Sequence, residues 1–381
     1  MVLYVNPDVV ISIAKGMSDR QQTQATRNAP EVSAPEFLEN LVARAEAAGA
    51  SDIHLQMRGD KAEVAFRLDG VLAPVTEIPS TTAERVFGRV KFLARLKTFQ
   101  DSLPQDGRIN REEIGARKDL RVATYPTVTG EKIVLRLFDG REAKSLAEIN
   151  FPDAARGALQ SFLTQPTGML LLTGPAGSGK TTTIYACLQF LATAGERHII
   201  TIEDPVEQII PGVMQTEVNE ARGLDYAKAA RHLLRQDPQV LVIGEIRDEA
   251  TAQIALRASL TGHLVITTLH AGSCRGVLER LLVLCPDHSV VATSVELILN
   301  QRLLRCLCPK CMGKRCGACL QTGYQGRQPV VEFLRLNGDA RARVAARDVE
   351  SLVAQPSLSD HARVLVQEGV TDESECRRVL G

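Results

Sequence analysis

The sequence predicts an α/β protein in which a smaller α+β domain precedes a domain built on a parallel sheet. Four short apolar runs, over 169–173, 198–202, 240–244 and 263–268, are separated by helical segments and loops. Continuous apolar strands that alternate with helices are typical of a parallel sheet covered on both faces. Earlier in the chain, 53–57 and 64–68 alternate as half-buried strands before an Asp69-Gly70 turn, which favours a separate α+β domain.

Composition narrows the class of protein. The chain has 381 residues, which suggests two or three domains, and 44% of them are hydrophobic, which excludes a disordered chain. The 45 basic and 45 acidic side chains cancel, and aromatic residues make up 4%, so bulk electrostatic or stacking contact with nucleic acid is not expected. No apolar run reaches the roughly 18 residues that span a bilayer. Residues 1–13 lack the basic flank of a signal peptide. We therefore expect a cytoplasmic protein.

The elements follow in order. Residues 1–34 are predicted to be a leader and a polar linker, and a helix is expected over 35–48, where apolar residues recur at helical spacing. The smaller domain is expected over 35–140 and the second domain over 141–381, beginning with a connecting helix and loop over 146–166. The last fifty residues are expected to be helical.

The segment GPAGSGKT carries the sharpest signal, because it matches the phosphate-loop pattern G-x-x-x-x-G-K-[ST] between a predicted strand and a predicted helix over 181–191. Its glycines let backbone N–H groups face a polyphosphate, and the helix N-terminus adds positive charge. Lys180 is expected to reach the β- and γ-phosphates of ATP, and Thr181 to ligate Mg²⁺. The predicted nucleotide-binding residues are Gly174, Pro175, Ala176, Gly177, Ser178, Gly179, Lys180, Thr181 and Thr182.

Three further segments follow predicted strands. VLVIGEIRD (240–248) ends an apolar strand in Glu245, which suits a carboxylate that holds the Mg²⁺ water shell. TIEDPVE (201–207) puts three carboxylates at the sheet edge that binds ligands in α/β proteins, where one of them is expected to orient the attacking water. In TGHLVITTLHAG (261–272), His263 and His270 bracket a strand, which favours a γ-phosphate sensor. Each segment has an alternative interpretation. Glu245 could be an ordinary surface charge, 201–207 could be a solvated acidic loop, and the two histidines could be structural.

In this order, the four segments resemble the Walker A, Asp box, Walker B and His box of the secretion-superfamily ATPases of type II secretion and type IV pilus assembly. GASDIHLQ (49–56), FRLDGVL (66–72), LPQDGRI (103–109) and TVTGEKIVLRL (127–137) also look like this family. The resemblance implies a PAS-like N-terminal domain joined to a RecA-like ATPase domain in a homo-hexameric ring. It further implies work on an inner-membrane platform protein and on the pilin or pseudopilin assembly machinery, with peripheral attachment to the inner membrane.

The resemblance also implies roles for single residues. Glu203 matches the Asp-box glutamate that activates water, Glu245 the Walker B acid, and His270 the His-box residue near the γ-phosphate. Three positions match arginines of the N-terminal domain that reach the nucleotide: Arg108, Arg121 and Arg136. The chain departs from the family at Asp237-Pro238-Gln239, where Asp-Pro-Asp is usual. Because about 34 residues precede the PAS-like part, we expect no counterpart of the extra N-terminal domain that many type II secretion members carry.

Two C-x-x-C hooks, CPKC and CGAC, place Cys308, Cys311, Cys316 and Cys319 in a pattern typical of a structural Zn²⁺ site. The alternative is a set of buried or redox-labile thiols. The resemblance associates such hooks with assembly-type motors rather than retraction motors. The family usually has a longer segment between the hooks than MGKR, but Gly313 allows a sharp turn there. Of the other five cysteines, Cys306 is expected to be spare and the rest to be ordinary thiols.

Two other functions stay open at this point. One is a regulatory or scaffold subunit that binds ATP with little turnover, and the other is a nucleic-acid motor. Intact Glu203 and Glu245 weigh against the first, and sparse aromatic residues against the second.

The zero net charge is a cancellation: 201–250 hold ten acidic and five basic side chains, and 85–121 hold ten basic and five acidic ones. We expect the acidic segment to hold Mg²⁺ and water, and the basic one to meet phosphates.

Overall fold

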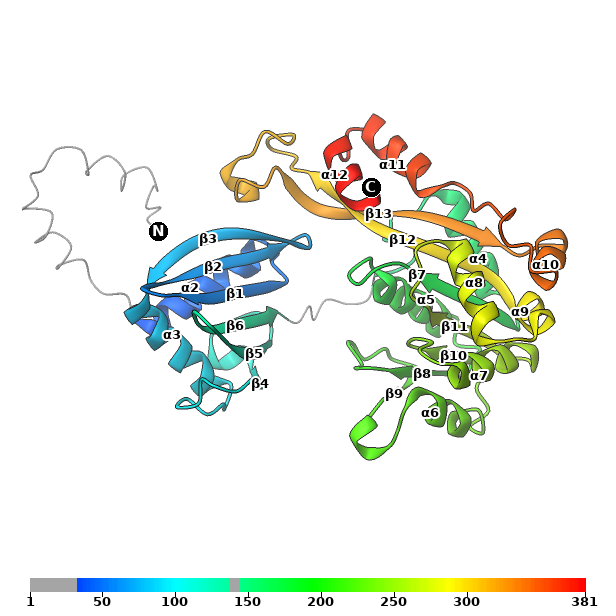
Figure 1. The fold of residues 1–381 in the computed structure, drawn as a ribbon, viewed down its shortest axis with the longest axis horizontal. Helices are drawn as coiled ribbons and strands as arrows, with labels where there is room; N and C mark the ends of the chain where they lie inside the picture. Colours follow the sequence, from blue (N-terminus) through cyan, green and yellow to red (C-terminus); the bar gives the residue numbers. More distant parts are fainter. Residues whose placement is uncertain (1–32, 138–143) are drawn as a thin grey trace, which may run out of the picture. The chain divides into compact units, whose positions relative to one another are not determined.

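The computed structural model describes residues 33–137 and 144–381, which form two compact units. The first unit contains 33–66 and 74–137, and the second contains 67–73 and 144–381. Each unit has its own sheet, of six strands in the first and seven in the second (Figure 1). The predicted leader over 1–32 and the predicted boundary at residue 140 lie outside the described residues.

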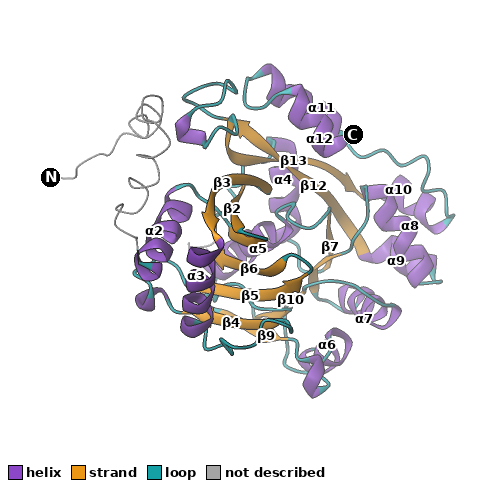
Figure 2. Ribbon diagram, turned by 60° about the vertical axis from the view of Figure 1, so that its left-hand side comes forward, coloured by secondary structure: helices purple, strands orange, loops and turns teal. Residues whose placement is uncertain are grey.

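The first unit is an α+β sheet with the strand order β3-β2-β1-β6-β5-β4. Its elements are α2 (Ala34–Ala47), β1 (Asp52–Arg58), β2 (Lys61–Leu68), β3 (Val71–Pro79), α3 (Ser80–Leu93), β4 (Gln105–Ile109), β5 (Leu120–Thr127) and β6 (Gly130–Leu137). The helix predicted over 35–48 begins where the Ser33 hydroxyl accepts a hydrogen bond of 3.3 Å from the amide of Glu36. Both helices lie on the same side of the sheet in Figure 2 and pack on each other. The predicted turn at Asp69-Gly70 has two positive φ angles, which suits a tight hairpin.

The second unit is an α/β sheet with the order β13-β12-β7-β11-β10-β8-β9. Its strands are β7 (Gly168–Thr173), β8 (Ile199–Glu203), β9 (Val213–Glu217), β10 (Val240–Ile243), β11 (Leu264–Thr268), β12 (Val295–Leu307) and β13 (Tyr324–Arg335). Neighbouring strands from β12 to β9 run parallel, so the parallel sheet predicted from the apolar runs is confirmed.

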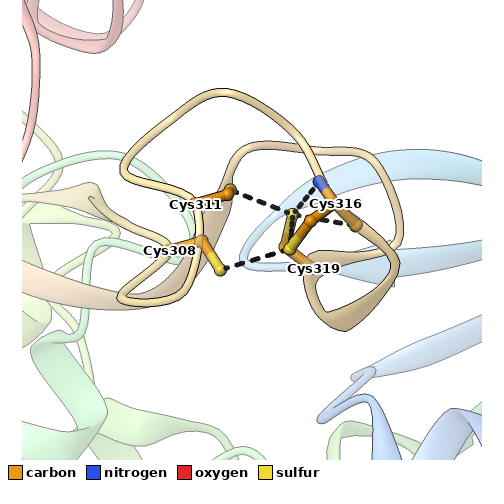
Figure 3. A group of neighbouring side chains, drawn as sticks. All are labelled: Cys308, Cys311, Cys316 and Cys319. Carbon is orange, nitrogen blue, oxygen red and sulfur yellow. Dashed lines mark hydrogen bonds between the residues drawn. The ribbon is translucent and has the colours of Figure 1, made fainter.

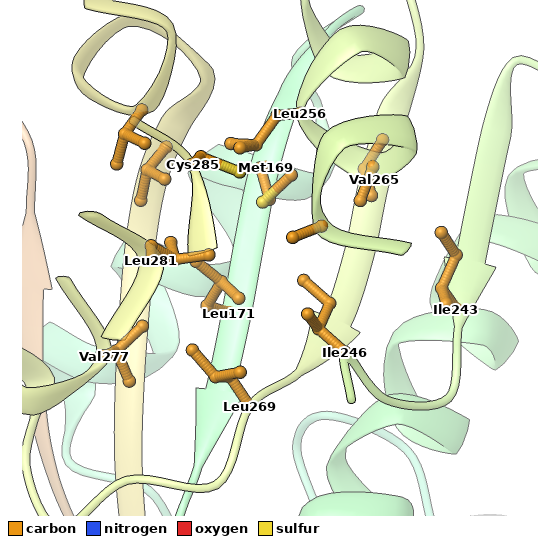
Figure 4. Close-up of a cluster of buried hydrophobic side chains, with 14 of the residues drawn as sticks. Met169, Leu171, Ile243, Ile246, Leu256, Val265, Leu269, Val277, Leu281 and Cys285 are labelled. Atoms are coloured by element: carbon orange, nitrogen blue, oxygen red, sulfur yellow. The ribbon is translucent and has the colours of Figure 1, made fainter. Parts of the chain in front are cut away.

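Helices cover both faces of this sheet. They are α4 (Asp153–Leu163), α5 (Lys180–Ala194), α6 (Tyr226–Leu233), α7 (Glu249–Leu260), α8 (Cys274–Leu284), α9 (His288–Ser294), α10 (Gly338–Ala345), α11 (Leu358–Gln367) and α12 (Glu373–Leu380). Because side chains alternate along a strand, Met169 and Leu171 pack with α6 to α10, whereas Leu170 and Leu172 pack with α4 and α5. Figure 4 shows part of the first of these cores. The sheet is therefore buried on both sides.

The long hairpin formed by β12 and β13 is the main feature that the sequence reading missed. Strand β13 pairs antiparallel with β12 and forms the outer strand of an otherwise parallel sheet. The expectation that the last fifty residues are helical is correct for α10, α11 and α12, but the segment begins within β13. The helix expected within 146–166 is α4. Among the described residues, no helix has the length and apolar character needed to cross a membrane.

Candidate active site

The phosphate loop connects β7 to α5, as predicted. Gly174, Gly177 and Gly179 all have positive φ angles, of 138°, 72° and 91°, which residues with a side chain rarely adopt. Gly179 is the N-cap of α5, and no side chain caps the helix there, so its first N–H groups are left for another acceptor. An uncapped helix start behind a left-handed glycine loop fits a bound phosphate.

A buried glutamine on β12 holds this loop by a hydrogen bond to its backbone. Gln301 on β12 is 1% exposed, and its amide donates a hydrogen bond of 2.8 Å to the carbonyl of Ser178. Its carbonyl oxygen accepts one of 3.0 Å from the hydroxyl of Thr183. A Cβ atom on Gly174 would lie 2.4 Å from the backbone oxygen of Gln301, so only glycine fits there. The cradle is thus fixed by contacts with β12 as well as by its own backbone.

Lys180 is folded back onto the loop. Its Nζ donates hydrogen bonds of 2.9 Å and 3.0 Å to the carbonyl oxygens of Gly174 and Pro175. Burial lowers the pKa of Lys180 from its ordinary value, Glu245 opposes this shift, and the guanidinium of Arg302 adds to it. Arg302 therefore supplies a second positive charge beside the loop, and it is held by hydrogen bonds to Asn300 and to two backbone oxygens.

Glu203 is the last residue of β8, and its side chain is buried, with hydrogen bonds to both carboxylate oxygens. Oε2 accepts a hydrogen bond from the hydroxyl of Tyr185 on α5. Oε1 accepts one of 2.5 Å from the hydroxyl of Thr201 and one of 3.0 Å from the amide of Gln215. A carboxylate that accepts three hydrogen bonds is held in one orientation.

Glu245 follows β10 and lies among charged partners. Its carboxylate pairs with Arg247, and Oε2 lies 3.2 Å from Nε2 of His270. Arg247 also reaches Asp204, at 3.2 Å, and Glu220, at 3.4 Å. One guanidinium therefore joins the segment after β10 to the segment after β8. His270, which the resemblance predicts to lie near the γ-phosphate, contacts Glu245.

These residues share one edge of the sheet because they follow the carboxyl ends of parallel strands. The loop that holds His270 is tied to β7 by Thr173, whose hydroxyl bonds to both the amide and the carbonyl of Ala271 at 3.0 Å. His263 precedes β11 and so lies at the opposite end of that strand, with Nδ1 3.0 Å from the carbonyl of Ala258. The two histidines do bracket β11, as the sequence indicates, but His263 lies away from the carboxyl end of the strand and so does not fit a γ-phosphate sensor.

Comparisons with known proteins agree with this geometry. A family model described as "Type II/IV secretion system protein" matches residues 28–378. The chain belongs to this family. The Protein transport protein HofB homolog of Haemophilus influenzae is 41% identical over 335 residues, which cover 87% of this chain and 70% of that protein. The type II secretion system protein E of Pseudomonas aeruginosa is 38% identical over 362 residues, which cover 87% and 72%. The resemblance to secretion-superfamily ATPases is confirmed, and membership makes this chain an ATP hydrolase.

Solved structures confirm the RecA-like α/β fold of this secretion ATPase. The ATPase DotB of Legionella pneumophila superposes with a TM-score of 0.71 at 21% identity, covering 91% of this chain and 96% of that one. The pilus retraction motor PilT, solved with bound ADP, superposes with a TM-score of 0.64 at 26% identity and the same coverage.

The four hook cysteines of the secretion ATPase gather at the tip of the β12–β13 hairpin (Figure 3). All four sulfur atoms lie within 4.8 Å of one another, with separations of 4.0 Å between Cys308 and Cys316, 3.9 Å between Cys311 and Cys319, and 3.8 Å between Cys316 and Cys319. Four thiolates about 2.3 Å from one Zn²⁺ lie about 3.8 Å apart, so this donor set fits zinc. Although burial opposes it, hydrogen bonds from the backbone amides of Cys316 and Gly323 lower the pKa of Cys319 to about 6.

The short segment between the hooks turns through left-handed residues. Met312, Gly313 and Arg315 have φ angles of 47°, 83° and 64°. A Cβ atom on Gly323 would lie 2.9 Å from the carbonyl oxygen of Gly313, so the two glycines pack closely. The predicted turn at Gly313 thus lets four residues connect the hooks.

Two cysteines outside the hooks, Cys187 and Cys274, are fully buried, and burial raises the pKa of each thiol.

The three predicted arginines form one row across the first unit. Arg108 on β4 lies opposite Arg121 on β5, and Arg121 lies opposite Arg136 on β6. Directly opposed residues share a face of the sheet, and all three side chains are exposed. Arg108 pairs with Asp119, and Arg136 pairs with Asp52 at 2.8 Å. Among the described residues, Arg121 has no ion-pair partner, which leaves a free cation at the centre of the row.

Sequence reasoning missed several residues of the site, namely Tyr185, Gln301 and Arg302. Two of them had a detectable signal. The run LILNQRLL places three polar residues inside an apolar stretch, and a buried strand accepts such residues only where they find partners. Tyr185 gave no signal, because its partner Glu203 is 18 residues away and belongs to another element.

Proposed function

We propose that this chain is a subunit of a homo-hexameric motor that hydrolyses ATP to drive assembly of a type II secretion pseudopilus or a type IV pilus. The observation that carries the proposal is the convergence of Lys180, Glu203, Glu245 and His270, from four parts of the chain, at one sheet edge. Phosphoryl transfer needs mainly positioned groups and charge neutralisation, and this edge offers both.

Each residue has a role in binding. The N–H groups of the loop, from Gly174 to Thr182, and the ammonium of Lys180 hold the phosphates of ATP. In doing so Lys180 exchanges its two backbone carbonyl partners for phosphate oxygens. The exposed hydroxyl of Thr181 and the carboxylate of Glu245 are the groups that would hold Mg²⁺. When bound, Mg²⁺ neutralises charge that develops on the phosphates.

The chemistry falls to Glu203 and its neighbours. Its carboxylate orients the attacking water and accepts a proton from it. His270 contacts Glu245 and reports on the γ-phosphate from the loop after β11. Arg302 and Lys180 offset negative charge on the same side of the loop.

The arginine row of the first unit is also assigned a role in ATP hydrolysis. In this proposal the first unit is the PAS-like N-terminal domain of residues 35–140, and residues 141–381 are the ATPase domain. In this proposal Arg108, Arg121 and Arg136 contact the phosphates of ATP, as the family resemblance implies. Support comes from their common exposed face and from the family resemblance.

The partners are an inner-membrane platform protein and the pilin or pseudopilin machinery, to which the motor attaches peripherally from the cytoplasm. No direct contact with nucleic acid is expected. The printed names of two relatives support this class: one is a protein transport protein, and another, 37% identical, is a type IV pilus assembly ATPase of Acinetobacter baylyi. Cys308, Cys311, Cys316 and Cys319 hold a structural Zn²⁺, which favours an assembly motor over a retraction motor.

Hydrolysis of Mg²⁺-ATP by the purified full chain tests the proposal. Lys180→Ala is expected to abolish turnover and weaken ATP binding, whereas Lys144→Ala, at an exposed lysine of the second unit, is expected to match the wild type. Equal turnover in Lys180→Ala and the wild type would contradict the proposal. Turnover that rises with added DNA and falls steeply with salt would favour a nucleic-acid motor instead.

A further inference from the structure

Tyr185 lies on the helix that follows the phosphate loop, four residues after Thr181. Residues four apart on a helix lie on the same face, one turn from each other. The tyrosine is 4% exposed, so its side chain is buried. Its buried hydroxyl must find hydrogen-bond partners there.

The hydroxyl of Tyr185 makes three hydrogen bonds whose directions are fixed. It accepts bonds of 3.0 Å and 3.2 Å from the backbone amides of Glu207 and Gln208, which can only donate. Its single proton is then left for Oε2 of Glu203, because an ionised carboxylate can only accept. Burial and the bond to Glu203 raise the pKa of Tyr185 above its ordinary value, so the hydroxyl keeps this proton near neutral pH.

The two oxygens of Glu203 are held differently. Oε1 has two donors, from Thr201 and Gln215. Among the described residues, Oε2 has Tyr185 as its one hydrogen-bond donor. Removing the tyrosine hydroxyl would therefore leave one oxygen of the carboxylate without its donor and would free the carboxylate to turn.

We propose that Tyr185 is a positioning residue for ATP hydrolysis, which holds the carboxylate of Glu203 in the orientation needed to meet the attacking water and ties it to the helix that carries Lys180 and Thr181. This inference rests on the proposed function of Glu203. Tyr185 does not touch the nucleotide in this proposal. It acts through Glu203 and through the backbone of 207–208.

Tyr185→Phe tests the inference, because it removes the hydroxyl and keeps the ring. We expect kcat to fall about tenfold or more, with the KM for ATP within about twofold, because a misplaced catalytic group slows chemistry more than binding.

Other groups around Glu203 could contribute to a loss of turnover. They are Asp204 beside it, Tyr226 on α6, and Glu245 and Arg247 after β10. A double-mutant cycle separates their contribution. If Tyr185 acts through Glu203, then Tyr185→Phe should have little further effect on turnover in a Glu203→Gln background.

Tyr324→Phe is the matched control. Its hydroxyl also donates to a carboxylate, at 2.8 Å to Asp372, and Tyr324 lies on β13 opposite Leu307, the last residue of β12. The substitution should lower thermal stability without changing kcat. Thr201→Val is a second test variant, because it removes one donor to Glu203 and leaves the 207–208 backbone untouched; a smaller fall in kcat is expected.

The outcomes separate the inference from the proposed function. If Glu203→Gln is inactive while Tyr185→Phe and Thr201→Val keep the wild-type kcat, the role of Tyr185 is wrong and the proposed function stands. Additive losses in the double mutant would also overturn that role. If Glu203→Gln hydrolyses ATP at the wild-type rate, the proposed catalytic role of Glu203 is wrong.

Discussion

The side-chain carbonyl of Gln301 accepts a hydrogen bond of 3.0 Å from the hydroxyl of Thr183, which joins the middle of β12 to the first turn of α5. The same amide group bonds to the phosphate loop at Ser178. Seven residues farther along the chain from Gln301, the cysteine hooks begin with Cys308. One continuous segment thus contacts the nucleotide cradle in its middle and leads into the predicted zinc element.

Gln301→Leu should destabilise the protein by about 1–3 kcal/mol, because the Ser178 carbonyl loses the amide that bonds to it and the Thr183 hydroxyl keeps only its bond to the Gly179 carbonyl. We also expect weaker ATP binding, since the loop loses its support. Thermal unfolding and titration with a fluorescent ATP analogue measure the two effects. Thr183→Val removes only one of the two bonds and should have the smaller effect on both. A Gln301→Leu variant with unchanged affinity for ATP would contradict a supporting role.

Substitutions of Glu203 and Glu245 should impair ATP hydrolysis in different ways. Glu203→Gln should keep ATP bound and slow its hydrolysis by about a hundredfold or more, the usual worth of a general base. Glu245→Gln should raise the Mg²⁺ concentration needed for half-maximal turnover, because it removes a charged group beside the metal. Single-turnover assays across a Mg²⁺ series distinguish the two variants. The same Mg²⁺ dependence in both would contradict separate roles.

The cysteine cluster should carry one zinc ion per chain in tag-free protein. Cys319→Ser should lose the metal, because it removes one of four sulfur ligands. Cys306→Ser, outside the hooks, should keep it. Elemental analysis of the purified variants provides the measurement. An absence of zinc from the wild type, or its retention by Cys319→Ser, would show that the hooks are ordinary thiols.

The buried carboxylate of Glu375 fixes the last helix to β12. It accepts hydrogen bonds of 2.6 Å and 2.9 Å from the guanidinium of Arg305, and it also pairs with Arg378. Although burial opposes it, these bonds lower the pKa of Glu375 from 4.5 to about 2. Its contribution to stability is therefore complete above about pH 4.5 and is lost as the pH falls towards 2.

Glu375→Gln should therefore lower the free energy of unfolding by about 3 kcal/mol at pH 7, because two arginines lose their buried partner. The difference from the wild type should shrink as the pH falls below 4.5. Denaturant unfolding at several pH values measures this. The control is Glu373→Gln, an exposed acid on the same helix, which should change stability little. A constant difference at every pH would contradict the ionised pair.

Arg121→Ala should leave the stability of the chain within about 0.5 kcal/mol, because the side chain is exposed and unpaired among the described residues. Turnover should nevertheless fall about tenfold or more if this arginine meets the phosphates. Arg58→Ala, at an exposed position of the same unit, serves as the control. Steady-state ATPase assays and thermal unfolding give both readings. Wild-type turnover in Arg121→Ala would contradict a role of Arg121 in ATP hydrolysis.

The strands show which elements a sequence pattern can predict. Apolar runs predicted β7, β8, β10 and β11 to within one or two residues at each end, because a strand buried on both faces must be apolar throughout. The hairpin of β12 and β13 was not predicted. Polar residues such as Asn300, Gln301 and Arg302 interrupt the apolar pattern of β12, and their partners come from other elements.

The sequence by itself determined the phosphate loop, the two acids and the cysteine hooks, because each is a short motif whose chemistry is contained in neighbouring residues. Only the tertiary structure decided what surrounds them. The hydroxyl of Tyr185 on Glu203, the amide of Gln301 beneath the loop, and the row from Arg108 to Arg136 depend on strand order and register. Long-range packing sets these, and no local pattern of residues encodes them.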